Sequence, residues 1–321
     1  MGVLAKKSNG AIAFALVLTV LLWGASNAGT KRLVATWPSI WVGSTRFLLG
    51  GLISLLILRY TNWLGPATKL TPEDQRGLWL RGGLTLAVYI VVFNLALHLT
   101  SAAHVALYLG AAPVWALLWE ERPSATARSM RRYASAALAL SGVMVLFWPS
   151  LRSGATRWIG ELLGVLASVL WAVFGFQGRA LGARLAGTEI SAHAMFRSGV
   201  LLLPFAVVET VMTSLDQKSG FILFKSEFWN WRLVLIQLYC AIGGGTLAYA
   251  LFYGALRHWT TSRVYLFNYL IPVSTMIFAH FCLGEPVTTT FWAAIALVMC
   301  GVALGQEGWL KVFGTKWLSA E

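Results

Sequence analysis

The chain has 321 residues, of which 58% are hydrophobic and only 12% are charged. Soluble globular chains carry about 25% charged and roughly 45–50% apolar residues. This composition, with a mean hydropathy of +0.69, excludes an ordinary soluble enzyme, a disordered chain and a disulfide-stabilised secreted domain. Each spanning helix needs about 20 apolar residues, so the chain has room for roughly ten. We therefore predict an all-α polytopic membrane protein.

The formal net charge is +13, from 25 Lys and Arg against 12 Asp and Glu. Most basic residues lie between apolar runs, where they orient helices and contact anionic headgroups. The charge therefore predicts a lipid bilayer as partner and no nucleic acid. The three cysteines, Cys240, Cys282 and Cys300, lie in apolar segments without a CxxC spacing. We expect no disulfide, metal or other cofactor at them.

Ten apolar segments of helical length follow one another along the chain, and we predict that each spans the membrane. The two longest connections, 60–79 and 213–232, are too short for a soluble domain. The predicted spans are residues 11–29, 38–59, 80–99, 102–119, 132–149, 159–178, 191–212, 233–256, 260–282 and 288–306.

An internal repeat divides the chain into two halves of five spans, residues 10–149 and 159–307. Because five is odd, the second half enters the membrane from the opposite side. We therefore expect two inverted five-helix repeats, with the substrate site between them near the midplane. The matching pairs are Ala96-Leu97 with Ala255-Leu256, Pro113 with Pro272 and Gly142-Val143 with Gly301-Val302 at a spacing of 159, Asn27 with Gln177 at 150, and Arg46 with Arg197 at 151.

The distribution of Lys and Arg predicts the orientation. With the N-terminus inside, inner segments hold 16 of these residues and outer segments hold 7. This excess predicts that both termini are cytoplasmic.

The ordered motifs of the two halves resemble the drug/metabolite transporter superfamily, and within it the EamA-type permeases of bacteria. This resemblance implies ten helices, a place in the bacterial inner membrane, and export or exchange of small metabolites. The family often has a Gly-Glu pair in both halves, but the position that matches Glu285 is Thr126. The motifs are Trp23-Gly24, Arg46, Ala96-Leu97, Thr100-Ser101-Ala102 and Pro113, then Leu256, Thr260-Thr261-Ser262, Pro272, Gly284-Glu285-Pro286 and Gly301-Val302.

Arg46 and Arg197 are the sharpest candidates for a functional site. Each lies about two turns inside an apolar helix, where a charge costs roughly 2.5–3.5 kcal/mol on insertion scales. One interpretation is an electrostatic clamp for a substrate carboxylate or phosphate. The other is a structural tie between helices, which the symmetry of the pair favours because substrates are not symmetric.

His104 and Arg263 occupy matching positions at the entrances of the fourth and ninth spans. His104 is a candidate for proton uptake in a coupled cycle, because an ordinary histidine titrates near pH 6.5. The alternative is a loop histidine that binds water.

Aromatic and amide side chains within the spans suit a cavity for an amphiphilic metabolite, and the alternative is helix packing. Glycines and prolines inside spans are candidate hinges, or positions of close helix contact. The further cavity candidates are Asn27, Tyr89, Asn94, Tyr108, Trp171, Gln177, Tyr249, Tyr253, Tyr265 and Asn268. The hinge candidates are Gly243, Gly244, Gly245, Pro113 and Pro272.

The sequence contains no Walker loop and no HExxH motif, so we expect no enzyme and no direct use of ATP. The predicted function is a secondary transporter that exports or exchanges a small organic metabolite, such as an amino acid, by alternating access. The alternative is a non-transporting scaffold of a larger membrane complex, with the small-residue faces of residues 134–142 and 293–301 as docking surfaces. A homodimer is a further candidate assembly.

Overall fold

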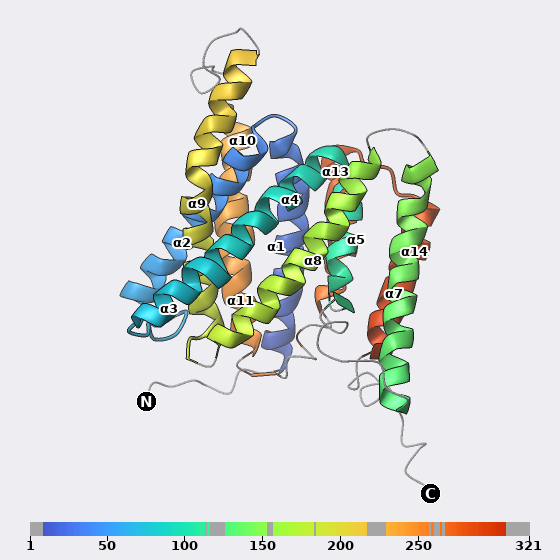
Figure 1. Cartoon of the computed structure of the whole chain (residues 1–321), viewed down its shortest axis with the longest axis horizontal. Helices are drawn as coiled ribbons and strands as arrows, with labels where there is room; N and C mark the ends of the chain where they lie inside the picture. Colours follow the sequence, from blue (N-terminus) through green and yellow to red (C-terminus); the bar gives the residue numbers. More distant parts are fainter. Residues whose placement is uncertain are drawn as a thin grey trace, which may run out of the picture.

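The structure is a computed structural model, and it shows a bundle of helices packed side by side (Figure 1). All regular structure in the part of the chain that it describes is helical. The described residues are 9–112, 114–115, 126–152, 157–182, 184–216, 229–256, 258–259, 264 and 267–305. Arg263, Tyr265 and Pro113, three of the predicted site and hinge residues, lie outside them.

The helices follow the predicted apolar segments in chain order. They are α1 (Asn9–Val34), α2 (Ser39–Tyr60), α3 (Pro72–Gly77), the π-helical segment η1 (Leu78–Leu84), α4 (Thr85–Leu99), α5 (Ala102–Gly110), α7 (Ala127–Arg152), α8 (Arg157–Leu181), α9 (Gly187–Asp216), α10 (Trp231–Tyr239), the π-helical segment η3 (Cys240–Leu247), α11 (Ala248–Leu256), α13 (Ile271–Leu283) and α14 (Thr289–Gly305).

Six helical runs within the described residues are long and apolar enough to cross a membrane, and two shorter apolar helices accompany them. Large apolar side chains on their outer faces, such as Phe281 at 80% exposure, suit contact with lipid. The prediction of an all-helical membrane protein is confirmed. The six runs are Asn9–Val34, Ser39–Tyr60, Pro72–Leu99, Trp158–Gly178, Gly187–Leu215 and Trp231–Leu256, and the shorter helices are Ile271–Leu283 and Thr289–Gly301.

The third helical run begins at Pro72, earlier than the predicted start at residue 80. Thr71 caps it through a capping box, in which its hydroxyl accepts from the Asp74 backbone N–H and the Asp74 carboxylate accepts from the Thr71 N–H. Such a box satisfies backbone groups that the first turn leaves free. Proline at the first helical position adds to this start signal.

The predicted spans 102–119 and 260–282 are interrupted rather than continuous. Helix α5 ends at Gly110 and is followed by a turn at Ala111, whereas α13 begins at Ile271 after a turn at Tyr269 and Leu270. Pro272 lies in the first turn of α13. Proline is tolerated in the first turn of a helix but not in its interior, so α13 starts here, after the helical residues Phe267 and Asn268 and the turn that follows them.

Glycines allow close contacts between helices that are far apart in sequence. A Cβ on Gly51 of α2 would lie 2.2 Å from the backbone nitrogen of Phe196 in α9, and one on Gly199 would lie 2.4 Å from that of Leu48. The small-residue faces of α7 and α14 also meet, because a Cβ on Gly301 would lie 2.5 Å from the nitrogen of Ala139. These two faces, which are the candidate docking surfaces of the scaffold hypothesis, therefore pack on each other.

Helix contacts recur in the two predicted halves. Helix α1 of the first half packs against α11 and α13 of the second half. Helix α8, which corresponds to α1, packs in the same way against α4 and α5 of the first half. Helices α2 and α9 pack along each other, as do α7 and α14. Figure 1 shows that α2 and α9 run in opposite directions.

Gly51→Ala tests the contact between α2 and α9. The added methyl group meets the backbone of Phe196, so the helices must separate, and such overpacking costs about 1–3 kcal/mol. We expect a lower midpoint of thermal unfolding for the purified protein in detergent. Gly254→Ala is the control, because nothing lies within 4 Å of a Cβ at Gly254. Equal midpoints for the two variants would contradict the contact.

Candidate functional site

Arg46 of α2 lies between helices of both halves and is only 8% exposed. Its Nη1 donates to the Thr30 hydroxyl at 2.6 Å, and its guanidinium lies 4.9 Å from the centre of the Phe47 ring. Cys240 and the hydroxyl of Tyr89 lie within electrostatic range. Among the described residues, no carboxylate forms a salt bridge with Arg46, and its buried Nε donates to none of their atoms.

Arg197 of α9 is held by three neighbours. Its Nη2 donates to the Gln75 side-chain oxygen, and its Nη1 donates to the backbone oxygen of His193 at 3.5 Å. The guanidinium lies 5.3 Å from the centre of the Trp79 ring. The side chain therefore ties α9 to α3 and η1, while the matching Arg46 has fewer hydrogen-bond partners.

Each arginine lies beside a π-helical segment of the other predicted half. The Arg46 guanidinium lies within electrostatic range of Cys240 in η3, and a Cβ on Gly83 in η1 would lie 2.8 Å from the Cβ of Arg197. The glycines Gly243, Gly244 and Gly245 all belong to η3. A Cβ on Gly244 would lie 2.4 Å from the Ser26 hydroxyl oxygen. Gly244 thus allows close packing with α1, while the role of the three glycines as hinges stays a prediction.

The aromatic candidates form two clusters, one between α4 and α8 and the other between α1 and α11. Tyr89 of α4 lies 5.2 Å from Trp171 of α8, measured between ring centres, and 5.5 Å from Phe93. In the second cluster, Trp23 of α1 lies 5.4 Å from Tyr249 of α11, and Tyr253 packs on Tyr249 and Phe252. Only the first cluster lies beside Arg46, through Tyr89.

The amide candidates link helices rather than gather at one point. Asn27 donates to the Thr275 hydroxyl at 3.1 Å, and Asn94 donates to the backbone oxygen of Ser39 at 2.8 Å. Gln177 accepts from the Thr85 hydroxyl at 2.7 Å. Asn268 is half-buried before α13.

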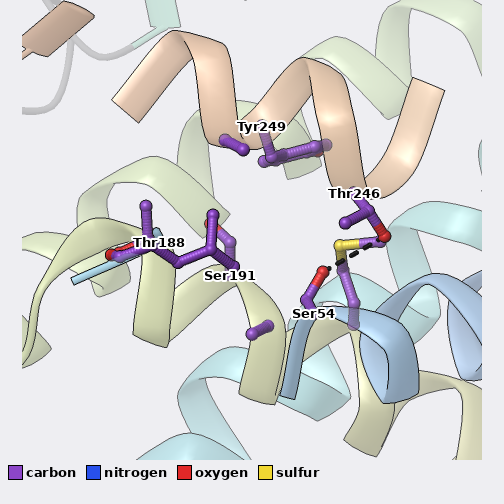
Figure 2. A pocket seen from close by; sticks show the side chains of 9 residues that line it. Ser54, Thr188, Ser191, Thr246 and Tyr249 are labelled. Carbon is purple, nitrogen blue, oxygen red and sulfur yellow. Dashed lines mark hydrogen bonds between the residues drawn. The ribbon is translucent and has the colours of Figure 1, made fainter. Parts of the chain in front are cut away.

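A small cavity lies between α2, α9, η3 and α11, and Figure 2 shows the side chains around it. About 210 Å³ of space there is free of atoms, including the part that is open to the outside. The Ser54 hydroxyl donates to that of Thr246 at 3.3 Å across one wall. The lining residues are Ser54, Leu64, Thr188, Ser191, Ala192, Met195, Thr246, Tyr249 and Ala250.

His104 and Tyr108 of α5 meet at a carboxylate that the sequence analysis missed. Glu161 of α8 is 0% exposed. Its Oε1 lies 2.8 Å from His104 Nδ1 and accepts from the Thr100 hydroxyl at 2.7 Å, and its Oε2 accepts from the Tyr108 hydroxyl at 2.5 Å. An acid within an apolar span is itself a signal of function, so Glu161 was visible in the sequence although its partners were not.

Two half-buried acids bind the starts of helices. Glu209 Oε2 accepts from the backbone N–H groups of Ile40 and Trp41 at the start of α2. Glu285 Oε1 accepts from the Ala102 N–H at the start of α5. Carboxylates at helix N-termini are stabilised by the free N–H groups and the helix dipole, so both contacts explain the placement of these acids.

Apolar helices that are long enough to span a membrane and hold polar side chains between them define a polytopic membrane protein. The EamA-like transporter family matches residues 10–148 and 158–305, and the chain belongs to this family. It is therefore a membrane transporter and not an enzyme.

Relatives agree with this assignment. An uncharacterized transporter of Archaeoglobus fulgidus is 27% identical over 300 residues, covering 90% of this chain and 95% of that protein. A probable amino-acid metabolite efflux pump of Salmonella typhimurium is 22% identical over 302 residues, covering 94% of each. A crystal structure that is 19% identical matches with a TM-score of 0.59 over 93% of this chain and 98% of that chain, which supports the fold alone.

A double-mutant cycle of Arg197→Gln and Gln75→Leu tests the tie between α9 and α3. Because the two side chains bind each other, we expect their effects on unfolding free energy to be non-additive by about 0.5 kcal/mol or more. A control cycle pairs Gln75→Leu with Arg232→Gln, since Arg232 is exposed at the start of α10. Additive effects in the first cycle would contradict the tie.

Proposed function

We propose that this transporter moves a small organic anion, such as an amino-acid metabolite, by alternating access between two inverted five-helix halves. The two ranges matched by the family and the recurring helix contacts support the two halves. An amino-acid metabolite agrees with the printed name of the Salmonella typhimurium relative.

The observation that carries this proposal is the environment of Arg46. A buried charge with few partners is costly in a bilayer and usually faces a substrate path or an ion partner. Arg46 has a hydroxyl and a ring as neighbours, but no salt bridge with a described carboxylate. A substrate carboxylate would supply the missing counter-charge and accept charge-assisted hydrogen bonds from the guanidinium.

The neighbouring rings supply the apolar part of such a site. Tyr89 lies beside Arg46 and contacts Trp171 of the second half. Metabolite sites combine mostly apolar walls with a few polar groups that fix orientation. Arg46 with this ring cluster therefore fits a compact amphiphilic anion. Arg197, with its side-chain and backbone acceptors, serves packing in this proposal.

The small cavity beside α9 supports a conformational cycle. Ligand sites are commonly about 300–1,000 Å³, whereas the space that a water-sized molecule can occupy in this cavity is only about 10 Å³. A metabolite would need α9 and α11 to separate there. The recurring contacts suit such rocking of one half against the other.

Arg46→Gln tests the anion site in purified protein reconstituted into liposomes. We expect the native protein to show saturable counterflow of at least one member of a panel of amino acids and their acidic derivatives. Loss of the guanidinium removes charge-assisted bonds, so uptake of that compound should fall about tenfold or more. Arg46→Lys keeps the charge but not the fork geometry and should give an intermediate rate.

Arg59→Gln is the matched control, because Arg59 lies exposed near the end of the same helix. Native uptake by this variant, with normal yield of both Arg46 variants, would support the anion site. If both Arg46 variants lose yield and thermal stability together with transport, the arginine serves packing instead. If the native protein moves no compound of the panel, the proposed substrate class is wrong.

We further propose that the protein lies in the bacterial inner membrane with both termini cytoplasmic, as the Lys and Arg counts indicate. Green fluorescent protein fused to the C-terminus should fluoresce in cells, because it folds in the cytoplasm. Alkaline phosphatase fused at the same point should be inactive. The reverse result would overturn the orientation.

A further inference from the structure

We propose that the side chain of Met195 closes the route between Arg46 and the small cavity beside α9, and so acts as a gate of the transporter. The route itself rests on the proposed anion site at Arg46. The closure rests on the packing around Met195 and can be tested without a substrate.

One face of α2 leads from the anion site to the cavity. Arg46, Gly50 and Ser54 follow one another at a spacing of four residues. Residues at this spacing lie on the same side of an α-helix, about 6 Å apart along its axis. Ser54 lines the cavity. Gly50 therefore lies at a middle level, between the proposed site and the cavity.

The π-helical segment η3 follows the same three levels. Cys240 lies within electrostatic range of the anion-site guanidinium, and Thr246 lies at the cavity, where its hydroxyl accepts from that of Ser54. A π-helix bonds residues five apart, so Cys240 and Gly245 share a face. A Cβ on Gly245 would lie 4.0 Å from the Cα of Gly50. The two glycines therefore face each other at the middle level.

Met195 of α9 fills the notch that Gly50 and Gly245 leave. A Cβ on Gly50 would lie 2.9 Å from the Met195 Cε, and one on Gly245 would lie 3.0 Å from the same atom. Met195 is only 2% exposed, and it also lines the cavity. The tip of this side chain therefore lies between the cavity and the level of Arg46.

The cavity is suited to receive a charged compound. The five side chains that Figure 2 labels all carry a hydroxyl group, and a hydroxyl can donate to an anion. Leu64, from the connection after α2, and Thr188, in the first turn of α9, both belong to the lining. The cavity thus lies where α2 ends and α9 begins, which is the inner side of the membrane if both termini are cytoplasmic.

Helix movement can open this gate. Helix α2 belongs to the first predicted half, whereas α9 and η3 belong to the second. A Cβ on Gly50 would lie 2.7 Å from the backbone oxygen of Ala241, so α2 and η3 leave little room beside the Met195 tip. Rocking of the halves separates the walls of the notch. The unbranched thioether of methionine then adapts its shape readily, so it can leave the notch as the walls part.

Cys240 reports access to the level of Arg46. It is 0% exposed, and with Cys282→Ser and Cys300→Ser it is the only thiol of the chain. In this background, an anionic, membrane-impermeant methanethiosulfonate is added to right-side-out and to inverted membrane vesicles. We expect Met195→Ala to speed the modification of Cys240 about tenfold or more, because the native protein must open before the reagent can enter. The rise should come from one face only, which is the cytoplasmic face in the proposed orientation.

Met276→Ala is the matched control for this measurement. Met276 is a buried methionine of α13 that does not line the cavity. Its truncation removes the same atoms and loosens the bundle elsewhere, so Cys240 should react at the native rate. A native rate in Met195→Ala, an equal rise in Met276→Ala, or an equal rise from both faces would overturn the gate.

A second pair of variants keeps the proposal testable if Met195→Ala does not fold. Met195→Leu conserves volume and is usually well tolerated. Its side chain is shorter and does not reach the notch, so the modification of Cys240 should accelerate, but less than in Met195→Ala. Adding Gly245→Ala places a methyl group in the notch and should return the rate toward the native one. A native rate in Met195→Leu, or no return in the double variant, would contradict closure at the notch.

These measurements separate the gate from the proposed transport function, because none of them uses a transported compound. Failure of counterflow would overturn the transport of organic anions. Failure of the thiol measurement would overturn the gate, and any compound that is transported would then reach Arg46 by another route.

Discussion

Hydrocarbon offers no hydrogen bonds, and this constraint governs where the polar groups of the spanning helices find their partners. Backbone groups are satisfied within helices, and hydroxyls inside helices bond back to their own chain, as Thr210 does to the Ala206 oxygen. Larger polar groups must find partners on other helices. Among the described residues, the Glu161 carboxylate binds three side chains, and Arg197 contacts an amide, a backbone carbonyl and an aromatic ring. Arg46 contacts only a hydroxyl and an aromatic ring there. The two arginines therefore differ in how many of their hydrogen-bond donors have a partner.

Apolar helices gain little free energy by leaving hydrocarbon, so their association depends on close van der Waals packing. Glycine provides it where backbones meet, at Gly51 and Gly199 between α2 and α9 and at Gly301 between α14 and α7. The π-helical segments η1 and η3 lie in corresponding spans and pack on α9 and α2. Such segments occur often at functional sites, and here each lies beside one of the two intramembrane arginines. Each of the two arginines thus lies close to a tight helix contact.

Some features of the site were readable from the chain and others were not. Arg46 and Arg197 were identified because a charge within an apolar run is conspicuous, and the same rule applied to Glu161 would have found it. Nothing in the sequence showed that Thr100, His104 and Tyr108 converge on that carboxylate, because the approach depends on how α5 packs on α8. Pro113 and Pro272 were identified as hinge candidates, but both spans were predicted to be continuous, because apolar composition continues through the turns after Gly110 and before Ile271.

The sequence alone determined the helical membrane class, the approximate spans and the family, because apolar runs of spanning length and ordered motifs are local properties of the chain. It also supplied the matching pairs of the predicted repeat, whose spacing needs no coordinates. Tertiary structure decided which of those residues meet. Arg197 and Arg46 match in sequence but differ in partners, the aromatic residues divide into two clusters, and the small-residue faces of α7 and α14 cover each other. These outcomes depend on distances between helices, which are set by the packing of side chains far apart in the chain.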